Sequence, residues 1–115
     1  MAGKRILVVD DDAMVRESIE MMLGLDEHTL ELVGSGAEAL ERYLPGKYDL
    51  VLTDNRMAGM TGLELAKLIK ARDPSQRIIL FSGSLPTVEE PACDLILLKP
   101  FSAADLRKAV TSTAA

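Results

Sequence analysis

Hydrophobic and polar positions alternate along the chain in a way that predicts five strands separated by helices. The expected strands are apolar runs of four or five residues, at Arg5–Val9, Leu30–Val33, Leu50–Thr53, Ile78–Phe81 and Leu95–Leu98. Their near-continuous apolar character is typical of strands that are covered on both faces. The alternation therefore predicts an α/β fold, in which one parallel sheet lies between two layers of helices.

The first two helices are predicted from capping residues followed by a helical repeat of apolar positions. Asp12 is a candidate N-cap for a first helix with an apolar face made of Val15, Ile19 and Met22. Ser35 and Glu38 have the spacing of a capping box and predict a second helix, which Pro45 and Gly46 would stop. The residues expected to point inward from this helix are Ala37, Leu40 and Leu44.

Two further helices are expected, and one crossover is poor in helical signals. Thr61 and Glu64 form a second capping box, which opens a helix that ends before Pro74. Ser102 is a candidate cap for a last helix, with one apolar side made of Leu106, Ala109 and Val110. Residues 82–94 contain two prolines and a glycine, so the fourth crossover helix is expected to be short or absent.

Length, charge and cysteine content exclude several classes of protein. The 115 residues predict a single domain over 1–115, and we expect no effector domain. A formal net charge of −5 argues against nucleic acid as a direct partner, and no stretch is long enough to span a membrane. The single cysteine, Cys93, and the absence of a signal peptide indicate a cytoplasmic location.

Polar residues follow four of the five predicted strands. They are Asp10, Asp11 and Asp12 after the first, Asp54 after the third, Ser82 and Gly83 after the fourth, and Lys99 and Pro100 after the fifth. Parallel strands end at one edge of a sheet, and in the strand order 2-1-3-4-5 the second strand lies outermost. Several carboxylates, a hard cation such as Mg²⁺ and an ammonium group suit phosphoryl transfer, in which a carboxylate can be the nucleophile.

Each of these residues also has a purely structural interpretation. Asp12 and its neighbours could serve only as helix caps, and Asp54 could belong to the turn that Gly59 and Gly62 indicate. Ser82 before Gly83 is an ordinary turn dipeptide, and Lys99 could be a solvated lysine. We favour a functional site because chemically suited residues recur at the ends of four strands.

Four blocks of the sequence resemble those of a response-regulator receiver domain. The blocks are Leu7–Asp12, Asp49–Asp54 with Met57–Gly62, Ile79–Gly83, and Lys99–Phe101. They occur in order and extend over essentially the whole chain. The resemblance implies a flavodoxin-like (βα)5 three-layer sandwich with a five-stranded parallel sheet of order 2-1-3-4-5.

The resemblance also implies a role for each site residue. Asp54 would be the phosphoacceptor, and Ser82 would be the switch hydroxyl. Lys99 would pair with the phosphoryl group, and the peptide between Lys99 and Pro100 would be cis. The expected Mg²⁺ ligands are the carboxylates of Asp10, Asp11 and Asp54. The backbone carbonyl of Arg56 would complete the set. The phosphodonor would be a sensor histidine kinase or a histidine phosphotransfer protein. The chain would signal to an unknown downstream protein by contact, without being a conventional enzyme.

Three positions depart from the pattern of the family. Ala58 replaces the usual proline in the loop after the phosphoacceptor, and we expect a looser loop in which this residue touches no ligand. Ile96 stands where the family often has an aromatic switch residue, and residues 82–99 are fewer than usual. The Arg56 side chain, two residues after Asp54, could shield the acyl phosphate from water, steer a partner's phosphate, or simply be a solvated arginine.

Two other functions use the same residues. A degenerate receiver would bind its partner without phosphorylation. A haloacid-dehalogenase-like phosphatase would use Asp10 as the nucleophile and Asp12 as the acid/base, although the chain is short for that family. A dinucleotide-binding domain is disfavoured, since no glycine-rich fingerprint follows the first strand.

Overall fold

One parallel sheet of five strands forms the centre of the protein, in a computed structural model that describes residues 3–24, 27–83 and 93–112. The strands are β1 (Arg5–Val9), β2 (Thr29–Val33), β3 (Leu50–Asp54), β4 (Ile78–Ser82) and β5 (Leu95–Leu98). Their order across the sheet is β2-β1-β3-β4-β5, and all four neighbouring pairs are parallel. The expected strand order is thus confirmed.

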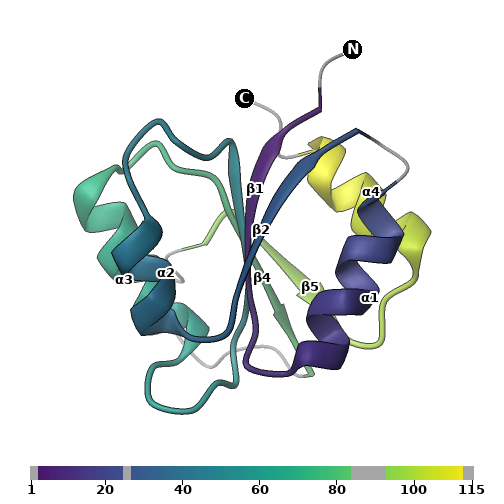
Figure 1. Ribbon diagram of the computed structural model, residues 1–115, viewed down its shortest axis with the longest axis horizontal. Coiled ribbons are helices and arrows are strands. Elements are labelled where there is room, and N and C mark those ends of the chain that lie inside the picture. Colours follow the sequence, from purple (N-terminus) through teal and green to yellow (C-terminus); the bar gives the residue numbers. More distant parts are fainter. Residues whose placement is uncertain (1–2, 25–26, 84–92, 113–115) are drawn as a thin grey trace.

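Helices cover both faces of this sheet. They are α1 (Ala13–Leu23), α2 (Gly36–Arg42), α3 (Gly62–Arg72) and α4 (Ala103–Ser112). Figure 1 shows the sheet nearly edge-on, with α2 and α3 on one side and α1 and α4 on the other. This arrangement confirms the flavodoxin-like three-layer sandwich. The expectation of a short or absent helix before β5 falls on residues 84–92 and lies outside the described residues.

The sheet divides the hydrophobic core into two clusters. Ile6 and Val8 of β1 pack into the cluster on the side of α1 and α4, while Leu7 and Val9 pack into the cluster on the side of α2 and α3. All four side chains are fully buried. Because successive residues of a strand face opposite sides of the sheet, burial on both faces requires an apolar run without alternation.

Three of the predicted helix caps are confirmed. The Asp12 carboxylate accepts a hydrogen bond from the Met14 N–H at the start of α1. Before α3, Thr61 and Glu64 each bond the other's backbone N–H and form a complete capping box. The Ser102 hydroxyl likewise accepts a hydrogen bond from the Asp105 N–H in α4. These bonds satisfy backbone donors that have no partner within the helix.

The second helix differs from its prediction. It ends at Arg42, so Leu44 is not inward-facing: it lies beyond the helix and is 60% exposed, and Ala37 is exposed as well. Leu40 does pack against the core as predicted, and the fully buried residues are Ala39 and Tyr43, which are four positions apart and share one face. The capping box is half formed, because the Glu38 carboxylate accepts from the Gly34 N–H while only the Ser35 hydroxyl bonds as expected.

Two strands extend one residue further than predicted toward the carboxyl edge. Asp54 is the last residue of β3 and Ser82 is the last residue of β4. The Asn55 N–H donates to the Phe81 carbonyl at 3.1 Å, which continues the ladder to the end of both strands. As a result, these two polar residues are held by the sheet itself, and they are 6% and 4% exposed.

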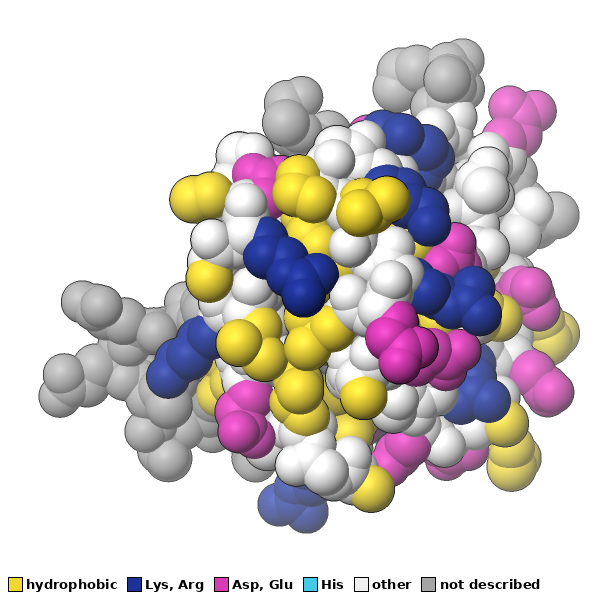
Figure 2. All heavy atoms as spheres, turned by 60° about the vertical axis from the view of Figure 1, so that its left-hand side comes forward, with side chains coloured by type: hydrophobic (Ala, Val, Ile, Leu, Met, Phe, Trp, Pro, Cys, Tyr) yellow, Lys and Arg dark blue, Asp and Glu magenta, His cyan; other side chains and the backbone are white. Residues whose placement is uncertain are grey.

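Charges of both signs are mixed on the surface over α2 and α3. Figure 2 shows this side, where Lys and Arg side chains stand among acidic side chains and exposed hydrophobic ones.

Within residues 3–24, 27–83 and 93–112, no helix has both the length and the apolar character needed to cross a bilayer.

Candidate functional site

The carboxyl edge of the sheet brings together the residues that the sequence placed at strand ends. Asp10 and Asp11 follow β1, and Asp54 ends the neighbouring strand β3. Lys99 follows β5, which lies beyond β4 in the sheet. Segments that are far apart along the chain thus supply a single polar site at one end of the sheet.

Three carboxylates of this site lie close together. Asp10, Asp11 and Asp54 each offer an oxygen, and the three oxygens are within 4.8 Å of one another. Asp10 is 2% exposed, and its Oδ2 atom has no hydrogen-bond partner in the described part of the chain. Burial, reinforced by the charges of Asp54 and Asp11, raises the pKa of Asp10 to about 6, against the lowering effects of the Asp12 N–H and Lys99.

The position of Asp10 is fixed from two sides. Its Oδ1 atom accepts a hydrogen bond from the Asp12 N–H at 2.9 Å. Its backbone carbonyl accepts one from the Arg16 guanidinium at 2.7 Å. Arg16 was not among the predicted site residues, although a cation one helical turn beyond three aspartates was a signal that could have identified it. The guanidinium adds positive charge beside the acidic cluster.

Lys99 is paired with the expected phosphoacceptor. Its ammonium nitrogen is 3.0 Å from Asp54 Oδ1 and 5.2 Å from the centre of the Phe81 ring. The Lys99 N–H donates to the carbonyl of Ser82 at 2.8 Å, which fixes the backbone at this position. The peptide between Lys99 and Pro100 is cis, as expected.

A pocket of about 340 Å³ lies over Asp54. Its lining residues are Asp54, Arg56, Gly83 and Lys99. The Arg56 side chain is exposed at the edge of this pocket. Its role as a shield and the use of its backbone carbonyl as a metal ligand both stay predictions. Ser82 is buried at the end of β4, one residue beyond the Phe81 that pairs with Asp54.

The loop between β3 and α3 contacts the acidic cluster directly. The Ala58 N–H donates a hydrogen bond to Asp11 Oδ2 at 3.0 Å. The expectation that Ala58 touches no ligand was therefore wrong, since Asp11 is one of the expected Mg²⁺ ligands. Side-chain identity did not indicate this contact, because the backbone makes it, and any residue except proline has the necessary N–H.

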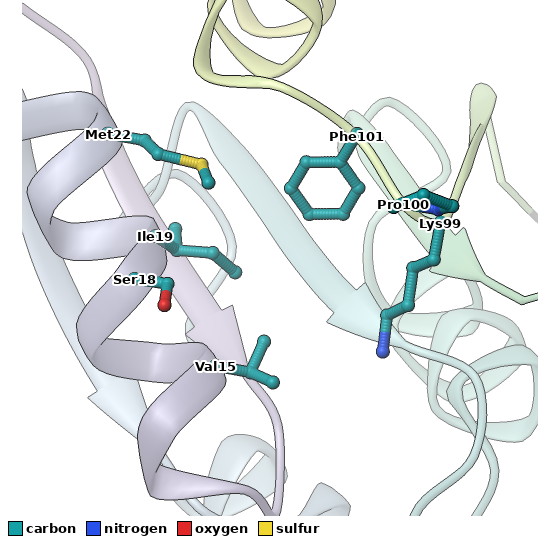
Figure 3. Close-up of a pocket in the computed structure, with 7 residues that line it drawn as sticks. All are labelled: Val15, Ser18, Ile19, Met22, Lys99, Pro100 and Phe101. Carbon is teal, nitrogen blue, oxygen red and sulfur yellow. The ribbon is translucent and has the colours of Figure 1, made fainter.

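An apolar groove adjoins the acidic site through Lys99. In Figure 3, residues of α1 face a second wall made of Lys99, Pro100 and Phe101. The residues that α1 contributes are Val15, Ser18, Ile19 and Met22. The groove has a volume of about 380 Å³. A partner held here would lie next to the lysine that pairs with Asp54.

The fold and this site define a class of doubly wound α/β proteins with an acidic, lysine-paired site at the carboxyl edge of the sheet. The model of the response regulator receiver domain matches residues 6–111, and the chain belongs to this family.

Curated relatives are response regulators of about twice the length of this chain. DNA-binding response regulator MtrA of Mycolicibacterium paratuberculosis is 32% identical over 108 residues, which are 90% of this chain and 48% of that protein. Response regulator MprA of Mycobacterium ulcerans is 34% identical over 107 residues, which are 89% of this chain and 46% of that protein. The chain thus spans about half the length of these relatives.

Solved structures of one response regulator closely match the fold. TrrA from Thermotoga maritima in complex with Mg²⁺-BeF is 33% identical, with a TM-score of 0.88 over 96% of this chain and 98% of that one. TrrA in complex with the histidine kinase ThkA is also 33% identical, with a TM-score of 0.87 over 97% of this chain and 99% of that one.

Proposed function

We propose that this receiver domain accepts a phosphoryl group on Asp54 from a phosphohistidine and signals by contact with another protein. The observation that carries the proposal is the grouping of the Asp10, Asp11 and Asp54 carboxylates beside an ammonium that lies 3.0 Å from Asp54. The pocket over Asp54 leaves room for a phosphoryl group. The histidine-kinase complex of TrrA supports a phosphohistidine as the donor.

The residues of the chain have distinct roles in this transfer. An oxygen of Asp54 forms a bond to phosphorus while the bond from phosphorus to the imidazole nitrogen of the donor breaks, and its electron pair stays on that imidazole. Lys99 pairs with the phosphoryl oxygens, and the Ser82 hydroxyl moves toward them. The signal ends by hydrolysis: water attacks phosphorus, the bond between phosphorus and the Asp54 oxygen breaks, and inorganic phosphate leaves the regenerated carboxylate. The protein therefore catalyses only its own reactions and is not a conventional enzyme.

The donor set fits Mg²⁺. Hard divalent cations favour carboxylate and carbonyl oxygens, and the buried Oδ2 atom of Asp10 lacks a partner among the described residues. Asp10, Asp11 and Asp54 would hold the ion with the backbone carbonyl of Arg56. When bound, Mg²⁺ would offset the negative charge of the carboxylates and of the phosphoryl group. The Mg²⁺-BeF complex of TrrA supports this assignment.

We assign the phosphodonor to a sensor histidine kinase or a histidine phosphotransfer protein, which would approach along the groove next to Lys99. The downstream partner would be a protein. A cytoplasmic setting belongs to the same proposal, with nucleic acid and membrane outside the direct contacts of this domain.

The test is phosphoryl uptake from acetyl phosphate with Mg²⁺, followed by the intact mass of the protein. Asp54→Asn should abolish uptake, because the amide cannot act as the nucleophile. Asp49→Asn is the matched control, since Asp49 precedes the same strand at its opposite end and pairs with Arg5. Uptake that persists in Asp54→Asn, or is absent from the wild type, would contradict the proposal.

No observation favours either alternative function over this one. The Asp12 side chain caps α1 and is not one of the three clustered carboxylates, which argues against a phosphatase that uses Asp10 and Asp12. A degenerate receiver would need a defect in the site, yet the Asp54–Lys99 pair and the acidic cluster are both formed.

A further inference from the structure

The backbone N–H of Ala58 is bonded to the exposed carboxylate of the acidic cluster. Asp11 is exposed, whereas Asp10 and Asp54 are buried at the strand ends. An exposed carboxylate samples several rotamers unless a hydrogen bond selects one of them. The bond from the Ala58 N–H to Asp11 Oδ2, at 3.0 Å, makes that selection.

The loop holds this N–H in place through its own backbone. The Gly62 N–H donates to the Asn55 carbonyl at 2.9 Å, which closes the loop at its base. The Met60 N–H donates to the Ala58 carbonyl at 3.1 Å, around Gly59 in a left-handed conformation with φ of 83°. The donor is therefore oriented by the loop rather than by the methyl group of Ala58.

The tip of the same loop also rests on α2. A methyl group on Gly36, the first residue of α2, would come within 2.8 Å of the Met60 sulfur. Glycine at this position thus lets the Met60 side chain lie directly against the helix. The loop is thus held at its base by a hydrogen bond and at its tip by packing on α2, and these contacts keep the Ala58 N–H next to Asp11.

We propose that the Ala58 N–H is a positioning group that orients Asp11 for Mg²⁺. It engages the Oδ2 atom of Asp11 and would leave the Oδ1 atom available to the ion. An ionised carboxylate has lone pairs enough for both interactions. The inference rests on the proposed function, because it assumes that the acidic cluster holds Mg²⁺. Groups that orient metal ligands raise the affinity for the metal without touching it.

The test compares Ala58→Pro, which lacks the N–H, with Ala58→Gly, which keeps it in a more flexible loop. Mg²⁺ is titrated into each protein and followed by backbone amide NMR shifts, without any phosphoryl donor. We expect Ala58→Pro to bind Mg²⁺ about 3- to 10-fold more weakly and Ala58→Gly to stay within about 2-fold of the wild type. Unchanged affinity in the proline variant, or equal losses in both, would overturn the inference. A wild type that does not bind Mg²⁺ would instead contradict the proposed function.

A second measurement does not depend on the folding of the proline variant. Amide hydrogen exchange is recorded for the wild type and for Asp11→Ala, both without Mg²⁺. The Ala58 amide should exchange about tenfold faster in Asp11→Ala, because its acceptor is lost. The Gly62 amide, bonded to Asn55, serves as the internal control and should not change. Equal exchange at Ala58 in the two proteins would overturn the inference.

Discussion

Three consecutive aspartates occupy three different environments. Asp10 is buried and fixed through its carboxylate and its backbone, Asp11 is exposed and bonded to Ala58, and Asp12 caps α1. The division follows from their distance to the sheet: the first residue after β1 is still inside the protein, and the third already belongs to the helix. Residue type alone therefore does not assign a role, because each added residue moves the carboxylate farther from the buried edge.

Away from the site, Asp94 provides a residue-scale prediction about pH. Burial alone would raise the pKa of Asp94, but the Ile78 N–H at 2.7 Å and the cations of Lys70 and Arg77 outweigh it and hold this pKa below its usual range. The ionised carboxylate is thus favoured by the folded state. We expect Asp94→Asn to lower the free energy of unfolding at pH 7 by about 1 kcal/mol, since these ion pairs are partly exposed.

The sign of the pH dependence follows from the lowered pKa. The contribution of Asp94 is complete above its unfolded pKa of about 3.9 and is lost as the pH falls through the lower folded value. Urea unfolding of wild type and Asp94→Asn should therefore give a constant difference from about pH 7 to 5 that shrinks below about pH 4. Glu20→Gln, on the exposed side of α1, is the control. A difference that shrinks as the pH rises from 5 to 7 would contradict this account.

At the scale of elements, regular patterns were predictable and individual contacts were not. The β strands and the caps Asp12, Thr61 and Ser102 depend on local sequence, and the structure confirms them. The short α2 was predicted two residues too long, because the early end of this helix and the burial of Tyr43 depend on packing against other elements. The contacts made by Arg16 and Ala58 likewise depend on which segments the fold brings together.

The start of α3 lies so close to β3 that only glycine fits. A methyl group on Gly62 would come within 2.3 Å of the Asp54 carbonyl and 2.7 Å of Leu80 Cδ1. We expect Gly62→Ala to lower the free energy of unfolding by roughly 1–3 kcal/mol, because the helix must move away from the strand that carries Asp54. Chemical denaturation measures this change.

Gly24, at the end of α1, is the matched control for Gly62→Ala. Its φ of −64° suits any residue, and a methyl group would meet nothing within 4 Å. Gly24→Ala should therefore leave stability unchanged or raise it by up to about 1 kcal/mol, through the lower entropy of the unfolded chain. Similar losses in the two variants would show that close packing against β3 is not the cause.

At the scale of the whole molecule, the sheet separates two hydrophobic clusters, and elements from both of its faces contact the acidic site. Arg16 approaches Asp10 from α1 on one face, and the loop that carries Ala58 rests on α2 on the other. The edge strands are not equivalent, since β5 leads directly into Lys99 while β2 supplies none of the proposed site residues. A charge placed on Asp54 is therefore expected to act on one edge of the sheet more than on the other.

This asymmetry gives a prediction for the activated state. Under the proposed function, a phosphoryl group on Asp54 would compete for Lys99, whose ammonium lies 3.0 Å from Asp54 and whose backbone N–H bonds the Ser82 carbonyl. Because β5 precedes Lys99 and has a neighbouring strand only on the β4 side, we expect backbone displacement there. Beryllium fluoride with Mg²⁺ should shift the amide NMR signals of Leu95–Leu98 more than those of Thr29–Val33.

The two edge strands serve as test and control within one sample, and Asp54→Asn with the same additions separates phosphoryl mimicry from the effect of Mg²⁺ alone. Ile96 pairs with Leu80 in β4 and is half-buried, so a shift of β5 can be accommodated without an aromatic side chain at this position. Equal shifts in β2 and β5, or shifts confined to the residues around Asp54, would show that Lys99 does not pass the signal to the edge of the sheet.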